Sequence, residues 1–195
     1  ASVLKAAGYQ TICVHPYPAS FYGRDKVYPH LGFDEFIDIR SFDQSERSGP
    51  YVSDHSITDK VKGLLGSAAG PLFIFVITME NHGPLHLEKP EVADYASLFC
   101  TNPPAGCDDL TIYLRHVKNA DQMIGDLREF LVQYHRPARL CWYGDHVPIM
   151  AEVYGQLGDP DGMTEYFIWS NRLGEKKAPK TVLSLDALAG RLLTT

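Results

Sequence analysis

The segment Pro71-Leu72-Phe73-Ile74-Phe75-Val76-Ile77-Thr78-Met79 decides the fold, because it is apolar over almost its whole length. A half-buried strand alternates apolar and polar side chains, whereas a parallel strand covered on both faces is apolar throughout. Gln10 to Val14 is a shorter run of the same kind, and Arg139 to Tyr143 and Glu165 to Ser170 are further candidate strands. Helical patterns lie between these runs. They predict an α/β fold, with a mostly parallel sheet between two layers of helices.

Two segments carry the clearest helical patterns. Asp54 is a candidate N-cap for a helix that ends near Gly66, and apolar side chains recur at steps of three and four residues between Leu110 and Tyr134. The chain has 195 residues, of which 45% are hydrophobic, so we expect one domain over residues 1–195. The net charge of −6 gives no basic surface for nucleic acid, and no apolar run in this chain is long enough to span a bilayer.

Polar residues follow three of the predicted strands at the point where each strand ends. His15 follows the first strand, His82 lies shortly after the second, and Asp145-His146 follow the third. Ligands of open α/β sheets bind outside the carboxyl ends of the strands, so these side chains are expected to share one site. Asp and His are suitable ligands for a divalent metal ion. Taken alone, an Asp-His pair is better explained by a solvated loop than by a metal site.

Other polar residues give weaker indications. Glu80 is a candidate for a supporting role beside His82. His116 and His135 lie on the long predicted helix, and we expect them to be structural or solvated. Cys100 and Cys107 flank a short loop and could form a disulfide in an oxidising compartment, although the sequence leaves a pair of free thiols equally open.

Four blocks together resemble the sulfatase and alkaline-phosphatase superfamily. They are Gly8-Tyr9-Gln10-Thr11 with His15, the segment from Phe21 to Phe36, Thr78-Met79-Glu80-Asn81-His82-Gly83-Pro84, and Tyr143-Gly144-Asp145-His146. The most similar branch contains lipoteichoic-acid-synthase-like enzymes, phosphoglycerol transferases and capsular polysaccharide biosynthesis proteins. This resemblance spans most of the chain from Gly8 to Ser170 and implies an alkaline-phosphatase-like fold.

The resemblance also implies roles for individual residues. Asp145 and His146 correspond to ligands of a divalent metal, most often manganese, with zinc, magnesium or calcium as alternatives. His15, Tyr22 and Arg24 correspond to residues that bind the substrate's phosphate and polar head. The planar fork of an arginine suits a phosphodiester on chemical grounds as well. His82 is expected to be catalytic, as an acid toward the leaving oxygen.

In that branch the nucleophilic threonine and the first acidic metal ligand precede the block that begins at Gly8. We therefore expect this chain to be the C-terminal part of a catalytic domain, incomplete at its N-terminal side and inactive by itself. The parent protein is expected at the periplasmic or extracytoplasmic face of a bacterial membrane, which it would reach through a segment outside this chain. Its substrate would be lipid-linked or a glycan.

The implied reaction is the metal-dependent transfer of a phosphoglycerol or similar group to a cell-surface or capsular glycan. A hydrolase, either a sulfatase or a phosphodiesterase acting on a glycan, is the main alternative. The chain could also be a glycan-binding module without catalytic activity. The sequence does not identify the donor, the acceptor or the oligomeric state.

Overall fold

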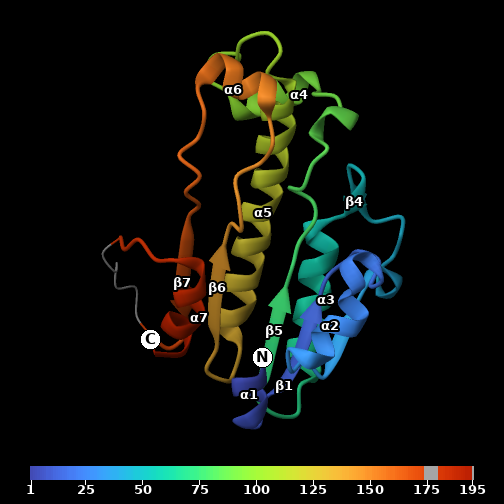
Figure 1. Cartoon of the computed structure of the whole chain (residues 1–195), viewed down its shortest axis with the longest axis vertical. Coiled ribbons are helices and arrows are strands. Elements are labelled where there is room, and N and C mark those ends of the chain that lie inside the picture. The colour runs from blue at the N-terminus through green and yellow to red at the C-terminus, as the bar shows by residue number, and fades with distance from the viewer. Residues whose placement is uncertain (174–179, 195) are drawn as a thin grey trace. The chain divides into compact units, whose positions relative to one another are not determined.

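A computed structural model describes residues 1–173 and 180–194. By its internal contacts the chain divides into two compact units, Ala1–Ile124 and Gly125–Thr195. Each unit has its own strands (Figure 1). The expectation of a single domain over residues 1–195 stays a prediction.

The first unit is built on a three-stranded parallel sheet in the order β2-β1-β5. Strands β1 (Gln10–Val14) and β5 (Leu72–Val76) pair along their whole length, and β2 (Glu35–Ile37) pairs with the other side of β1. This arrangement confirms the predicted parallel strands. The chain passes from β1 to β2 on one side and later returns to β5 on the other side of β1. The strand order therefore reverses at β1, and α/β proteins bind ligands at the carboxyl end of such a switch point.

The remaining elements of the first unit are short, apart from two helices that carry long apolar stripes. They are α1 (Ser2–Ala6), η1 (Phe21–Gly23), α2 (Arg24–His30), η2 (Ile39–Ser41), β3 (Arg47–Ser48), β4 (Tyr51–Val52), α3 (Asp54–Ser67), η3 (Leu85–Leu87), α4 (Val92–Leu98) and α5 (Asp108–Gln133), whose last turns belong to the second unit. Strands β3 and β4 form a small antiparallel hairpin.

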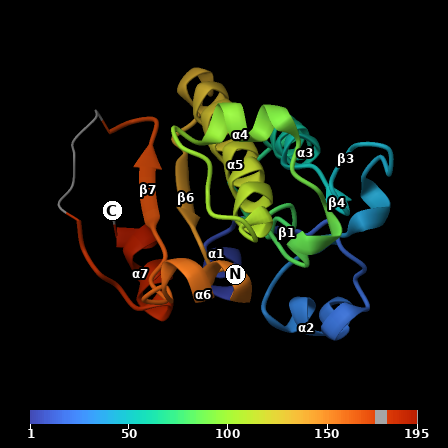
Figure 2. The same ribbon diagram turned by 90° about the horizontal axis from the view of Figure 1, so that it is seen from above.

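Apolar side chains cover both faces of the parallel sheet. On one face, Phe33 stacks on Phe73 and Phe75 with ring centroids 6.2 and 6.1 Å apart. On α3, Ile57 and Val61 are buried. Figure 2 shows α2 and α3 on opposite sides of the sheet. The apolar residues of β5 and the last three residues of β1 agree with this double cover, whereas Thr11 of β1 is buried and donates its hydroxyl hydrogen to the carbonyl of Gly32.

The start of α3 differs from the prediction. Ser53, not Asp54, is the N-cap, and its hydroxyl accepts a hydrogen bond from the backbone N–H of Ser56 at 3.2 Å. Asp54 is the first helical residue and is completely buried. Both residue types can cap a helix, so the sequence could not tell which of the two neighbours does so.

In the second unit, β6 (Arg139–Tyr143) pairs with β7 (Tyr166–Ser170). Both strands were predicted, but they run antiparallel, unlike the pairs in the first unit. Helices α6 (Ala151–Leu157) and α7 (Leu185–Thr194) complete the described part of this unit. Asn171, just after β7, ties the strands to α5, since its side chain accepts from the N–H of Ala138 and donates to the carbonyl of Leu131.

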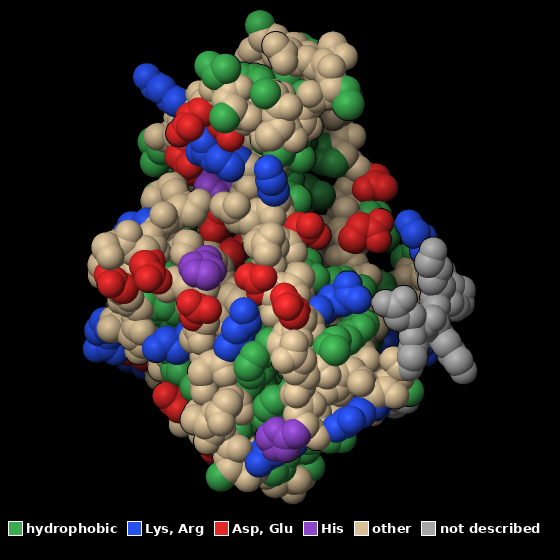
Figure 3. Space-filling model, turned by 180° about the vertical axis from the view of Figure 1, so that it is seen from behind, with side chains coloured by type: hydrophobic (Ala, Val, Ile, Leu, Met, Phe, Trp, Pro, Cys, Tyr) green, Lys and Arg blue, Asp and Glu red, His purple; other side chains and the backbone are tan. Residues whose placement is uncertain are grey.

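Two general expectations can be compared with the described residues. Cys100 and Cys107 are both free thiols, so the disulfide that the sequence allowed is absent; Cys107 is buried just before α5, whereas Cys100 is exposed. Within residues 1–173 and 180–194, no helix combines the length and apolar character that crossing a bilayer requires. On the face drawn in Figure 3, positive and negative side chains are interspersed.

Candidate substrate and metal site

His15 lies at the carboxyl end of β1 and is almost completely buried. Its backbone N–H donates to the carbonyl of Ile37, and its Nδ1 donates to the carbonyl of Ile77 at 3.0 Å. Since Nδ1 carries the hydrogen, Nε2 is an acceptor, and this buried atom has no hydrogen-bond partner within the described part of the chain. Burial lowers the pKa of His15, and the charges of Arg24 and His82 add to this effect while the bond to Ile77 opposes it. The ring is therefore neutral at pH 7.

Arg24, the first residue of α2, brings a positive charge to the same region. Its guanidinium lies over the rings of Phe21 and Tyr22, at 5.3 and 5.4 Å from their centroids. Its Nη1 is buried and, among the described residues, has no hydrogen-bond partner. Tyr22 has a φ of 55°, a left-handed conformation that costs free energy in a residue other than glycine. Such strain is concentrated at functional sites, and the Tyr22 ring is 80% exposed.

Two tyrosines that sequence reasoning missed connect these residues to His82. The ring of Tyr17 lies 6.0 Å from His15, 5.0 Å from Phe21 and 6.4 Å from Tyr51, measured between centroids. The ring of Tyr51 lies in turn 6.1 Å from that of His82. The position of Tyr17 two residues after His15 could have suggested its role, but no local signal identifies Tyr51, which comes from the β3–β4 hairpin.

Tyr51 also helps to fix the ring of His82. The carbonyl of Gly83 accepts hydrogen bonds from the hydroxyl of Tyr51 and from Nδ1 of His82, both at 2.7 Å. Because Nδ1 donates, Nε2 is the ring nitrogen that can accept a proton or a hydrogen bond. The His82 ring is exposed, so it can reach a ligand. The structure thus brings His15, Tyr22, Arg24 and His82 together within the first unit.

Glu80, which was expected to support the site, points into the protein interior. It is 1% exposed, and its carboxylate accepts hydrogen bonds from the backbone N–H of Asp54 and from the side chains of His116 and Asn119. His116 was expected to be structural or solvated, and the structure shows it buried. Its ring lies between two carboxylates, those of Glu80 and Glu88. No periodicity in the sequence indicated this buried ionic network.

Asp145 and His146 follow β6 in the second unit. Oδ1 of Asp145 accepts the N–H of His146, and Nδ1 of His146 donates to the carbonyl of Val147. Both side chains are exposed, and Nε2 of His146 lies 3.7 Å from Oδ2 of Asp145. Gly144 permits this turn, because a Cβ at that position would lie 3.1 Å from the side chain of Thr164.

This pair fits the requirements of a divalent metal only in part. Ligand atoms sit about 2.0 to 2.2 Å from a bound zinc ion, so two donors 3.7 Å apart can share one ion. Catalytic metal sites usually employ three protein ligands. Among residues 1–173 and 180–194, no group of three or more His, Cys, Asp or Glu side chains is placed to hold a metal. The joint site of Asp145 and His146 with His15 and His82 stays a prediction, because the pairs belong to different units.

Comparisons with known proteins bear on the family and the fold of this chain. A family model described as Sulfatase matches residues 1–195. The capsular polysaccharide biosynthesis protein RkpI of Rhizobium meliloti (strain 1021) is 35% identical over 170 residues, which cover 85% of this chain and 28% of that protein. The chain spans about a third of the length of the curated relatives that it matches.

Among solved structures, the Streptococcus pyogenes phosphoglycerol transferase GacH in complex with sn-glycerol-1-phosphate matches with a TM-score of 0.69 and 29% identity, over 87% of this chain and 45% of that one. The C-terminal periplasmic domain of EcEptC from Escherichia coli, solved as a complex with Zn, matches with a TM-score of 0.59 and 15% identity, over 85% of this chain and 48% of that one. These similarities confirm the predicted alkaline-phosphatase-like fold.

Proposed function

Because this chain belongs to the sulfatase family, we propose that it is the substrate-binding part of a metal-dependent phosphoryl-group transferase. In this proposal the enzyme transfers phosphoglycerol or a similar polar head from a lipid-linked donor to a cell-surface or capsular glycan. The whole protein would act on the periplasmic or extracytoplasmic side of a bacterial membrane. Similarity to a phosphoglycerol transferase and to a capsular polysaccharide biosynthesis protein supports this choice within the family.

The observation that carries the proposal is that two buried polar atoms of this site, Nε2 of His15 and Nη1 of Arg24, have no hydrogen-bond partner among residues 1–173 and 180–194. An unsatisfied buried polar group costs about 1 to 3 kcal/mol, and a bound ligand that hydrogen-bonds to such an atom removes this cost. Arg24 can donate to a phosphate oxygen, whereas the neutral His15 ring can accept from a hydroxyl. A ligand with an anionic phosphate next to a hydroxyl, as in glycerol phosphate, offers an acceptor for Arg24 and a donor for His15.

The other residues have complementary roles in this proposal. His82, with Nδ1 fixed by the Gly83 carbonyl, exchanges a proton through Nε2 with the leaving oxygen. Asp145 and His146 would hold the divalent ion, manganese by preference, which supplies charge neutralisation for the transferring group and lowers the pKa of a nucleophile. The nucleophilic threonine of the resemblance would come from sequence before Gly8, and the chain alone would then be inactive.

A binding experiment tests this proposal directly. The chain is titrated with sn-glycerol 1-phosphate in the presence of Mn²⁺, and binding is followed by calorimetry. Loss of a charge-assisted hydrogen bond costs about 1.5 to 3 kcal/mol, so Arg24→Ala should weaken binding by about tenfold or more. Lys26→Ala removes the same charge from an exposed position on the same helix and should leave the affinity unchanged.

The alternative functions give different results in the same titration. Preferential binding of a sugar sulfate ester over glycerol phosphate would replace the transferase by a sulfatase-type hydrolase. Binding of an uncharged glycan that is insensitive to Arg24→Ala would favour a glycan-binding module. Equal weakening by Arg24→Ala and Lys26→Ala would show that only net charge attracts the ligand, and the proposed site would be wrong.

A further inference from the structure

The loop that carries His82 is anchored by a buried carboxylate two residues earlier. Oε2 of Glu80 accepts the backbone N–H of Asp54 at 2.7 Å, where α3 begins. Oε1 accepts Nδ1 of His116 at 3.0 Å and also the side-chain amide of Asn119, both on α5. Since a buried charge is stable only when it is paired and hydrogen-bonded, these contacts determine where residue 80 can lie.

Among the described residues, His116 is the only side chain in contact with Glu80 that can carry a positive charge, and a carboxylate faces each of its ring nitrogens. The ring is 0% exposed, with Nδ1 at 3.0 Å from Glu80 and Nε2 at 2.9 Å from Oε1 of Glu88. Ionised carboxylates have no hydrogen to donate, so both ring nitrogens donate and the ring is an imidazolium. Burial lowers the pKa of His116, but the hydrogen bonds and charges of Glu80 and Glu88 outweigh burial and raise that pKa above its usual value.

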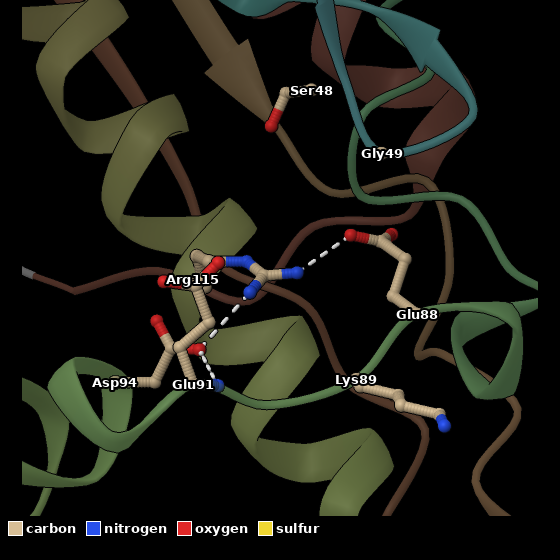
Figure 4. A pocket seen from close by; sticks show the side chains of 7 residues that line it. All are labelled: Ser48, Gly49, Glu88, Lys89, Glu91, Asp94 and Arg115. Atoms are coloured by element: carbon tan, nitrogen blue, oxygen red, sulfur yellow. Dashed lines mark hydrogen bonds and ion pairs between the residues drawn. The ribbon is translucent and has the colours of Figure 1, made fainter.

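Glu88 contacts a second positively charged side chain, that of Arg115, in addition to His116. Arg115 donates to Glu88 at 2.6 Å and to Asp94 of α4 at 3.0 Å (Figure 4). Glu88 borders an open cavity of about 410 Å³ that is lined by Ser48, Gly49, Glu88, Lys89, Glu91, Asp94 and Arg115. The buried ring of His116 therefore lies between Glu88, which borders this cavity, and Glu80, which anchors the loop.

The β3–β4 hairpin connects the same network to the far end of the loop. The hydroxyl of Ser48 lies 3.5 Å from Nδ1 of His116 and accepts from Asn119 at 3.4 Å. Three residues later on the hairpin, Tyr51 donates to the carbonyl of Gly83. The network therefore contacts the loop on both sides of His82, at residue 80 and at residue 83.

We propose that charged His116 is a positioning residue for His82, acting through Glu80. The proposal rests on the proposed role of His82, and it deepens that role by identifying what holds the loop. Loss of the His116 proton would leave two carboxylates facing a ring with a single hydrogen. One of the two hydrogen bonds would break, and residues 80–83 would lose a contact that fixes them.

The direction of the pH effect follows from the groups around His116. Glu80, Glu88 and the Ser48 hydroxyl face the ring, and Asp54 and Arg115 lie one contact further out. A group whose pKa is raised on folding stabilises the folded state below its unfolded pKa of 6.5, and the contribution is lost as the pH rises through the folded value. The loop should therefore loosen at alkaline pH.

Nuclear magnetic resonance of the histidine rings and of the backbone amides of residues 80–83 tests this proposal. At neutral pH, His116 should show both ring N–H signals, protected from solvent. When the pH is raised, one signal should disappear over the same range in which the His82 ring and the loop amides shift. Glu88→Gln should move that range to lower pH and speed amide exchange in the loop by about tenfold, the loss expected for a hydrogen bond to a charged group. Glu91→Gln, at the same cavity but without contact to His116, should behave as the wild type.

The outcomes separate this proposal from the proposed function. Loop and His82 signals that stay constant while His116 loses its proton would overturn the positioning role, and so would equal effects of Glu88→Gln and Glu91→Gln. Failure of the wild-type chain to bind glycerol phosphate would instead contradict the proposed function. The resonance measurements need no substrate, so they decide the positioning role in either case.

Discussion

Replacement of Asp54 by Asn should change how the stability of this protein depends on pH. Asp54 is 0% exposed, and neither carboxylate oxygen has a hydrogen-bond partner within the described residues. Burial, together with the nearby charge of Glu80, raises the pKa of Asp54 to about 7, although the charge of His116 opposes this rise. A group with this pKa is protonated in mildly acidic solution and ionised in mildly alkaline solution.

The size of the effect follows from the difference between the folded and unfolded pKa values. An acid whose pKa is raised on folding stabilises the folded state below its unfolded pKa, and this contribution is lost as the pH rises through the folded pKa. For Asp54 the window runs from 3.8 to about 7. At about 1.4 kcal/mol for each pKa unit, ionisation of this buried group costs the folded state about 4 kcal/mol.

The assay is urea denaturation of the wild type and of Asp54→Asn, followed by far-UV circular dichroism at several pH values. At about pH 4 both side chains are mostly neutral, and the two proteins should have similar free energies of unfolding. At about pH 8 the variant should be more stable by about 4 kcal/mol. Asp59→Asn is the control, because Asp59 lies on the same helix with an exposed side chain. If the two free energies of unfolding differ by the same amount at every pH, Asp54 has an ordinary pKa and the reasoning is wrong.

Two further predictions concern Gly49 and the cysteines. Gly49→Ala should destabilise the protein by about 1 to 3 kcal/mol, because Gly49 has a φ of +60° and the new Cβ would lie 2.3 Å from a carboxylate oxygen of Glu88. Gly63→Ala, in an open position within α3, should stabilise it by about 0.5 to 1 kcal/mol in the same denaturation assay. In the native protein without reductant, iodoacetamide should modify Cys100 quickly and Cys107 only after unfolding, as mass spectrometry can show. Protection of both thiols until a reductant is added would mean that they form a disulfide.

The sequence alone determined the strands and the residues at their carboxyl ends. The apolar runs at residues 10–14 and 72–76 became parallel neighbours, which placed His15 and the loop carrying His82 at one sheet edge. This inference succeeds because a strand covered on both faces consists mostly of apolar residues, a constraint that acts locally and is visible in the chain. Of the four predicted site residues in the first unit, His15 and His82 were predicted from their positions after strands, whereas Tyr22 and Arg24 were predicted through the family resemblance.

Only the tertiary structure decided how those residues are supported. Tyr51 reaches His82 from a hairpin that carries no strand pattern of its own, and His116 meets Glu80 and Glu88 from 36 and 28 residues away in the sequence. Periodicity indicates which face of a helix is buried but not which side chains meet there. A buried charge becomes tolerable only when the fold brings a hydrogen-bonded partner to it, so such a network cannot be recognised from either segment alone.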